Sequence, residues 1–323
     1  MTDAGPPQWE RTVLEKVALK ALDEQRRARQ WNALFKLLWF ILAFIIVSAW
    51  LGWIGRSDSD AIGSAAGKHT ALVDLEGIIG PGGKASADKI NKALEKAFKD
   101  TNTQGVVLRI NSPGGSPVQS GQINDEMRRL RAKYPNTPLY VVVQDLCASG
   151  GYYVASGADK IYVDKASLVG SIGVIISSFG FTGAMDKLGI ERRAYTAGEN
   201  KDLLDPFAPE NPVQREHIQK MLAEIHQQFI KVVRQGRGTR LKETPEMFSG
   251  LVWTGEKSVE LGLADGLGSL DYVAREVIKA EKVVDFTPKE NVFDQLAERL
   301  GTRLGEAFAR AAAQAAVRAV GAQ

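Results

Sequence analysis

The fold is decided by the stretch VVLRINSPGGS at residues 106–116, where a hydrophobic run passes directly into a glycine-rich turn. Its first five residues have the composition of a buried β-strand, and its two glycines allow backbone conformations that other residues avoid. The same order of features returns at residues 139–153, where the run LYVVV is followed, after a short connection, by ASGGYY. If both strands belong to one parallel sheet, both turns lie at carboxyl ends of strands, where open α/β folds bind ligands.

Strand-like and helix-like segments alternate on both sides of these stretches. The expected strands cover residues 71–79, 106–110, 139–143 and 161–163, and the expected helices cover residues 90–98, 123–130, a segment opening near Ser149, and 218–232. This alternation predicts an α/β domain with a largely parallel sheet over residues 70–285. The small, polar segment 55–69 before it is expected to be a linker.

The tail at residues 286–323 is rich in alanine and carries apolar residues at four-residue steps. This spacing predicts a C-terminal helix that packs on the domain or on a neighbouring subunit. Binding to a membrane surface is the alternative, which is weaker because the polar face mixes Glu with Arg.

The composition excludes several classes of protein. Of the 323 residues, 44% are hydrophobic and 24% are charged, as in a folded protein with a large core. The net charge of +3 is too balanced for a protein that neutralises phosphates, so nucleic acid is not an expected partner. The single cysteine, Cys147, excludes an internal disulfide and a multi-cysteine metal cluster. It is expected to be a small buried side chain, with a thiol nucleophile as the alternative; no metal or cofactor is expected.

A long apolar run precedes the domain. The eighteen residues from Leu37 to Ile54 carry no charge, and as a helix they would be roughly 27 Å long, enough to cross a lipid bilayer. Trp39, Trp50 and Trp53 lie near the ends of the run, where indole rings favour the interface between lipid and water. The sequence therefore predicts one transmembrane helix at residues 37–54.

The charges around this run predict its orientation. Arg26, Arg27, Arg29 and Lys36 precede it, whereas Arg56 is soon offset by acidic residues. Because positive charge favours the cytoplasmic side, residues 1–36 are expected to be cytoplasmic. The expected location is the inner (cytoplasmic) membrane, crossed once, with the domain on the periplasmic or extracytoplasmic side.

Ser149 is the best candidate nucleophile on local grounds. It lies between a predicted strand and a predicted helix, beside glycines whose N–H groups can approach a ligand closely. A serine hydroxyl needs a base, but the only histidines are His69 in the linker and His217 and His226 in a charged amphipathic helix. All three are expected at the surface, so a Ser-His-Asp triad is not expected.

Lysine can replace histidine as the base if burial favours its neutral form. The candidate is Lys201, in the loop AGENKDLLDPF at residues 197–207 before the long helix. Taken alone, this pattern is that of a solvated loop lysine.

Several motifs together resemble one protein family. In order along the chain they are NSPGGS at 111–116, ASGGYY at 148–153, GSIGV at 170–174, NKD at 200–202, TGEKS at 254–258 and LGLADGLG at 261–268. Their order and approximate spacing resemble the bacterial signal peptide peptidase A family over about residues 70–285. The chain is similar to the single-domain members of that family.

The resemblance implies a ClpP/crotonase-like fold and a Ser-Lys dyad without a cofactor. Ser149 would be the nucleophile and Lys201 the base, Ser171 would orient the lysine, and Gly115 and Gly150 would supply the oxyanion hole. It further implies a homo-oligomeric ring, with an octamer as one candidate size. The implied substrates are remnant signal peptides or other apolar peptides at the outer face of the membrane.

Three other functions stay open at this point. A related Ser-Lys protease would act on membrane proteins or misfolded periplasmic proteins instead. A crotonase-type acyl-CoA enzyme would use the same backbone donors, but coenzyme A chemistry belongs to the cytoplasmic side. An inactive binding module would require Ser149 and Lys201 to lie apart even in the assembled oligomer.

Overall fold

The computed structural model describes residues 25–27, 29–44, 47 and 67–288. The chain forms two compact units, and the unit of residues 62–288 holds the sheet and every motif named above. In the other unit, residues 29–44 are helical and their side chains are exposed. Among the described residues, no helix is both long and apolar enough to span a membrane. The predicted span at 37–54 includes residues 45–46 and 48–54, which lie outside the described part, as do most of segments 1–36, 55–69 and 286–323.

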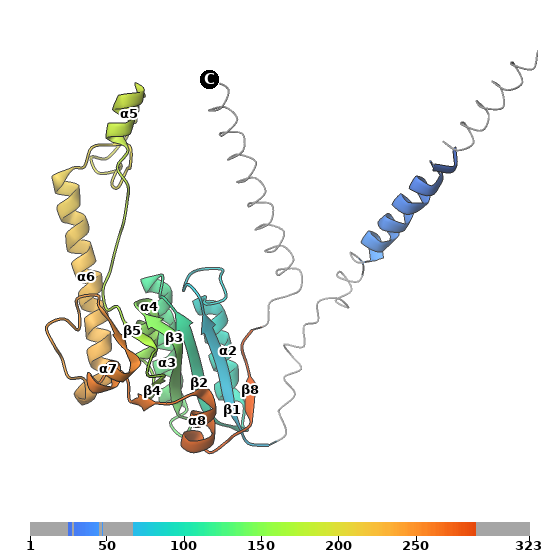
Figure 1. The fold of residues 1–323 in the computed structure, drawn as a ribbon, viewed down its shortest axis with the longest axis vertical. Coiled ribbons are helices and arrows are strands. Elements are labelled where there is room, and N and C mark those ends of the chain that lie inside the picture. Colours follow the sequence, from blue (N-terminus) through green and yellow to red (C-terminus); the bar gives the residue numbers. More distant parts are fainter. Residues whose placement is uncertain (1–24, 28, 45–46, 48–66, 289–323) are drawn as a thin grey trace, which may run out of the picture. The chain divides into compact units, whose positions relative to one another are not determined.

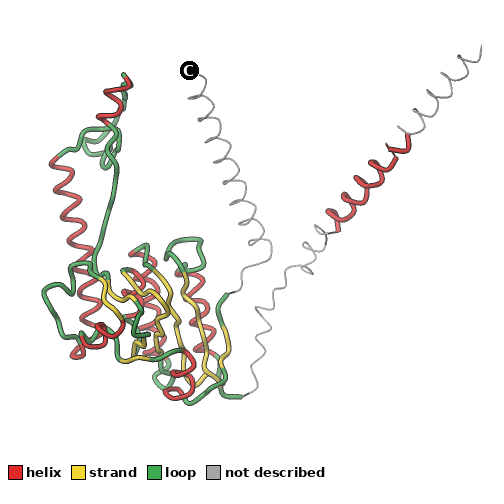
Figure 2. The backbone as a smooth tube through the Cα atoms, viewed as in Figure 1, coloured by secondary structure: helices red, strands yellow, loops and turns green. Residues whose placement is uncertain are grey.

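A largely parallel sheet forms the centre of the domain (Figures 1 and 2). Its strands are β1 (His69–Glu76), β2 (Thr103–Ser112), β3 (Leu139–Ala148), β4 (Lys160–Val163), β5 (Leu168–Gly170), β6 (Val252–Thr254), β7 (Gly266–Leu267) and β8 (Val283–Asp285). The main order is β6-β5-β3-β2-β1-β8, and only β6 runs antiparallel to its neighbour. β3 pairs with β4 through its first half and with β5 through its last residues, so the sheet forks beside β3. The predicted α/β class is confirmed.

Several helices pack against the sheet. The helices of this unit are α2 (Ala87–Lys99), α3 (Pro117–Lys133), α4 (Gly150–Ala155), α5 (Thr182–Leu188), α6 (Pro212–Arg237), α7 (Gly255–Glu260) and α8 (Leu270–Tyr272), with a 3₁₀ turn at Gly238–Arg240 and a π-helical turn at Val273–Ile278. Helix α2 buries Ile90, Ala93, Leu94, Ala97 and Phe98, the stripe that its periodicity predicts. Side chains of α2, α3, α4 and the end of α6 share one core with β1, β2 and β3. A smaller cluster, including Val107, Val142 and Val273, lies on the opposite face of the sheet beneath α8.

An arm leaves the domain after β5. The chain runs from residue 171 to α5 and returns through α6, whose N-terminal half extends beyond the sheet (Figure 1). Helix α5 buries no residue, and α6 buries only Phe229, Ile230, Val233 and Arg237 near its end. The predicted long helix is confirmed, but apolar residues of its first half, such as Ile218 and Leu222, are only half-buried within the described part of this chain.

Two sequence-based expectations need correction at the edges of the domain. His69 is not a surface residue of the linker, because it is the first residue of β1 and is fully buried. Its ring lies 3.3 Å from the Thr103 hydroxyl and stacks on Phe286. The domain also continues past residue 285, since Phe286 is buried and the Thr287 hydroxyl accepts a hydrogen bond from the Asp74 N–H. His226 is half-buried, whereas His217 is exposed as expected.

Candidate active site

Ser149 lies on a strained turn between β3 and α4. Its φ is 51°, a left-handed value that residues other than glycine rarely adopt. The Ser149 N–H donates to the Gly170 carbonyl at the end of β5, 2.8 Å away, which ties the turn to the neighbouring strand. The residue is half-buried. A polar side chain held on strained backbone at the carboxyl end of a parallel sheet is in the position where such folds place chemistry.

The glycine-rich turn after β2 packs directly against Ser149. A Cβ at Gly114 would lie 2.8 Å from the Ser149 Cβ and 2.6 Å from the Gly150 nitrogen, so only glycine allows this approach. A Cβ at Gly150 would lie 3.2 Å from the Gly115 nitrogen. The structure therefore brings together the predicted nucleophile and both predicted oxyanion donors.

The N–H groups of Gly115 and Gly150 are available to a ligand. Gly150 begins α4, so its N–H has no acceptor within the helix. Gly115 pairs with Ile79 in an isolated parallel bridge whose hydrogen bonds use the Gly114 carbonyl and the Ser116 N–H. Neither glycine N–H donates a hydrogen bond within the described part of the chain. Two such donors beside a serine can stabilise the negative oxygen of a tetrahedral intermediate.

Ser171 lies one strand away from Ser149. Gly170 pairs with Ala148 across β5 and β3, and Ser171 follows with φ of 49° and its N–H donating to the Leu251 carbonyl at 2.7 Å. Its place at the same edge of the sheet suits the role that the sequence predicts for it, which is to orient a catalytic lysine. Within residues 67–288, no lysine forms a hydrogen bond with the Ser171 side chain.

Lys201 does not meet Ser149 within one chain. It is exposed and belongs to the segment between α5 and α6; Figure 1 shows this segment at the end of the arm farthest from α4. The segment is held locally: Arg192 forms an ion pair with Asp205, and the Gln214 amide donates to the Asp202 carboxylate at 2.9 Å. The predicted dyad is thus not assembled in the single chain, and the roles of Ser149 and Lys201 stay predictions.

Cys147 is not a competing nucleophile. It is fully buried in the core, and this burial raises the pKa of its thiol well above the ordinary range, which disfavours the reactive thiolate. Among the described residues, no group of His, Cys, Asp or Glu side chains is arranged to hold a metal ion.

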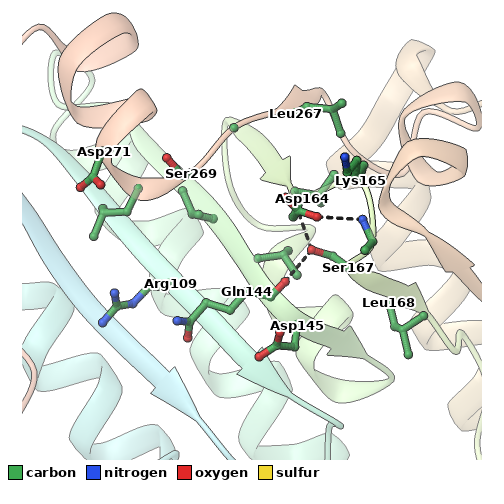
Figure 3. Close-up of a pocket in the computed structure, with 16 residues that line it drawn as sticks. Arg109, Gln144, Asp145, Asp164, Lys165, Ser167, Leu168, Leu267, Ser269 and Asp271 are labelled. Carbon is green, nitrogen blue, oxygen red and sulfur yellow. Dashed lines mark hydrogen bonds between the residues drawn. The ribbon is translucent and has the colours of Figure 1, made fainter.

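A separate cavity lies elsewhere in the domain (Figure 3). It has a volume of about 810 Å³ and lies in the fork between β4 and β5, on the face of the sheet that carries α8. Ser167 is one of the residues that line it, and its hydroxyl donates to the Gln144 carbonyl at 2.5 Å and accepts from the Asp164 N–H at 3.0 Å. None of the five predicted site residues lines this cavity, so it is separate from the candidate active site.

Comparisons with known proteins show which family the domain resembles. Residues 131–284 match the model of Peptidase family S49. Over 231 residues the chain is 31% identical to an Enterococcus faecium protein named "Putative signal peptide peptidase SppA", covering 69% of this chain and 67% of that protein. It is 32% identical over 221 residues to Protease 4 of Haemophilus influenzae, covering 67% of this chain and 35% of that protein.

A third relative carries a different name. The chain is 45% identical over 204 residues to the Na(+)/H(+) antiporter NhaA of Brucella melitensis. The matched stretch covers 62% of this chain but only 28% of the antiporter. This chain thus spans little more than a quarter of that relative's length.

Proposed function

Because this chain belongs to peptidase family S49, and its domain is that of a serine protease, we propose that it is an endopeptidase with Ser149 as nucleophile and Lys201 as general base. The observation that carries the proposal is the turn at Ser149, held against two unpaired N–H groups. Membership of this family favours proteolysis over acyl-CoA chemistry. It also favours an enzyme over an inactive binding module.

The geometry suggests how cleavage would proceed. The Ser149 Oγ attacks the peptide carbonyl while its proton passes to the neutral Lys201 amine, and the new oxyanion accepts hydrogen bonds from Gly115 and Gly150. The C–N bond then breaks, and the Lys201 ammonium returns the proton to the leaving amine. Water, deprotonated by the same amine, hydrolyses the acyl-serine ester. Since only the neutral amine accepts a proton, we expect activity to rise toward alkaline pH.

We further propose that the dyad forms between subunits of a homo-oligomer. Lys201 is exposed on an arm that leads away from the Ser149 of its own chain. The same arm exposes large apolar side chains, with Ile175 at 84%, Phe179 at 79% and Leu188 at 73%. Exposed apolar surface of this extent is typical of an interface. A neighbouring copy would cover it and receive Lys201 beside its own Ser149; an octameric ring is one candidate size.

The proposed location is the outer face of the inner membrane. The uncharged run from Leu37 to Ile54 supports a single anchor with a cytoplasmic N-terminus. An anchored enzyme would meet remnant signal peptides or other apolar peptides within the membrane plane, although a related activity on membrane or misfolded periplasmic proteins is the alternative. We expect the full chain to stay with membranes after an alkaline carbonate wash and a chain lacking residues 1–56 to be soluble. Full-length protein in the soluble fraction would contradict the anchor.

Labelling with a fluorophosphonate tests the dyad. Wild type, Ser149→Ala and Lys201→Ala would be purified as full chains in detergent, labelled, and mapped by mass spectrometry. We expect the label on Ser149 in wild type, none in Ser149→Ala, and strongly reduced labelling in Lys201→Ala. Lys187→Ala is the matched control, because Lys187 is an exposed lysine on the same arm and should leave labelling unchanged. Label on another residue, or full labelling of Lys201→Ala, would require a different assignment.

A further inference from the structure

Ser112 joins the two loops that flank the candidate oxyanion hole. It is the last residue of β2 and is fully buried. Its hydroxyl donates to the Gly77 carbonyl, which follows β1, at 2.6 Å. The same hydroxyl accepts from the Gly114 N–H, in the turn after β2, at 3.1 Å. One side chain therefore satisfies a carbonyl of one loop and an N–H of the other.

The loop after β1 also holds Gly115 directly. The Ile79 N–H donates to the Gly114 carbonyl at 2.9 Å, and the Ser116 N–H donates to the Ile79 carbonyl at 2.8 Å. These bonds use the groups on either side of Gly115 and leave its own N–H unpaired. A Cβ at Gly115 would lie 2.1 Å from the Ile79 oxygen, so the two loops are in close contact. The direction of the Gly115 N–H thus depends on where the loop at residues 77–79 lies.

We propose that Ser112 is a positioning residue for the oxyanion hole, acting through Gly114 and Gly115. This inference rests on the proposed function of Ser149. Without the hydroxyl, the Gly77 carbonyl and the Gly114 N–H lose their shared partner, and the loop after β1 is then held by two backbone links, the Gly77 N–H to Asn111 carbonyl bond and the Ile79 bridge. The Gly115 N–H then loses the alignment that a donor to the developing oxyanion requires.

Ser258 provides a contrast that separates positioning from burial. It is also fully buried, and its hydroxyl donates to the Gly255 carbonyl at 2.7 Å, but that bond lies within one turn of α7. Ser112 and Ser258 are thus alike in burial and in bonding to a backbone carbonyl. They differ in that only the Ser112 hydroxyl connects two loops beside Ser149.

The test compares Ser112→Ala with Ser258→Ala in the full chain, using an apolar peptide substrate well below the unfolding temperature of each variant. For Ser112→Ala we expect kcat to fall about 10- to 100-fold with little change in KM, because the hole is misaligned but not removed. The affinity for a peptide aldehyde, whose adduct with Ser149 places an oxygen in the hole, should fall in parallel. Ser258→Ala should lower the unfolding temperature and leave kcat within about twofold.

Each other outcome has a clear meaning. If Ser149→Ala is inactive but Ser112→Ala has wild-type kcat, or changes only KM, the positioning role of Ser112 is overturned and the proposed function of Ser149 stands. Cleavage that persists in Ser149→Ala overturns the proposed function itself, and the role of Ser112 with it. If Ser112→Ala does not fold, Ser112→Cys keeps a side chain of similar shape with a much weaker donor. It should show the same loss of kcat.

Discussion

At the residue scale, Cys147 and Ser149 show how two neighbouring side chains acquire different chemistry. Cys147 lies near the end of β3 and Ser149 directly follows this strand, yet Cys147 is buried in the core, where burial raises the pKa of its thiol. Ser149 lies at the strained turn, half-exposed and next to free N–H groups. The sequence leaves open the choice between a thiol and a hydroxyl nucleophile, and the different burial of the two side chains favours the Ser149 hydroxyl.

Asp265 is the residue for which the structure predicts a pH effect. Its carboxylate accepts hydrogen bonds from Arg237 at 2.8 Å, Arg240 at 3.1 Å and the Ile161 N–H at 2.7 Å, and Arg237 is almost fully buried. Burial alone raises the pKa of Asp265. The hydrogen bond and charge of Arg237, together with the Ile161 N–H and the charge of Arg240, outweigh this effect, so the pKa lies below its ordinary value of 3.8.

We expect Asp265→Asn to destabilise the domain by about 3 kcal/mol at pH 7, because Arg237 keeps a buried charge without its partner. A pKa that is lowered in the folded state gives stability above the ordinary pKa and loses it as pH falls below that value. The difference from wild type should therefore be full at pH 7 and shrink below about pH 4. Thermal unfolding between pH 7 and pH 3 measures it, with the exposed Asp125→Asn as control. A constant difference across this range would argue against the ion pair.

At the scale of elements, the arm differs from the rest of the domain. The sheet and α2 to α4 bury their apolar stripes, whereas α5 buries nothing and the first half of α6 is mostly exposed, with a few half-buried residues. An amphipathic helix gains its stability mainly from packing, so an uncovered arm indicates a partner. A second copy of the chain meets this need and explains where Lys201 would act.

Negative charges introduced on the arm by substitution should therefore prevent assembly of the proposed homo-oligomer without unfolding the domain. We expect the double variant Ile175→Glu, Phe179→Glu to yield monomers of about 35 kDa after chemical cross-linking in detergent, where wild type gives a ladder of larger species. Its unfolding temperature should change by only a few degrees, because both side chains are exposed. Leu267→Glu, at 50% exposure on β7, is the control that should still assemble. An unchanged ladder in the double variant would show that the arm is not the interface.

At the scale of the whole molecule, one chain holds the proposed nucleophile and the proposed base in places that do not meet. Ser149, Gly115 and Gly150 are assembled by the sheet of one subunit, and Lys201 is carried outward by its arm. In a closed ring, each site would take its serine from one copy and its lysine from the next. Activity would then depend on assembly.

Mixing two inactive variants tests this arrangement. Ser149→Ala and Lys201→Ala chains, dissociated and reassembled together at equal amounts, should recover about a quarter of the wild-type activity, because that share of sites combines an intact serine with an intact lysine. Each variant alone should cleave nothing in the same peptide assay. If the mixture stays inactive while oligomers containing both variants form, the dyad is assembled within each chain instead.

Local sequence patterns determined much of the secondary structure of this protein and the position of Ser149 within it. The periodicity of α2, the strands β2 to β4 and the placement of Ser149 between a strand and a helix were predictable, because hydrophobic periodicity is set by near neighbours along the chain. The approach of the turns at Gly114 and Gly150 followed from the expectation that both end parallel strands at one edge.

Tertiary structure decided the rest. Strands β5 to β8 have only two or three residues each, too few to show a period, and exist because distant strands pair with them. His69 is buried because β1 begins there beside β2, and the Ser112 hydroxyl meets the Gly77 carbonyl, which is 35 residues away. The exposed place of Lys201 likewise follows from the direction of the arm. Local periodicity carries no information about such long-range contacts, so only the folded chain shows which residues meet.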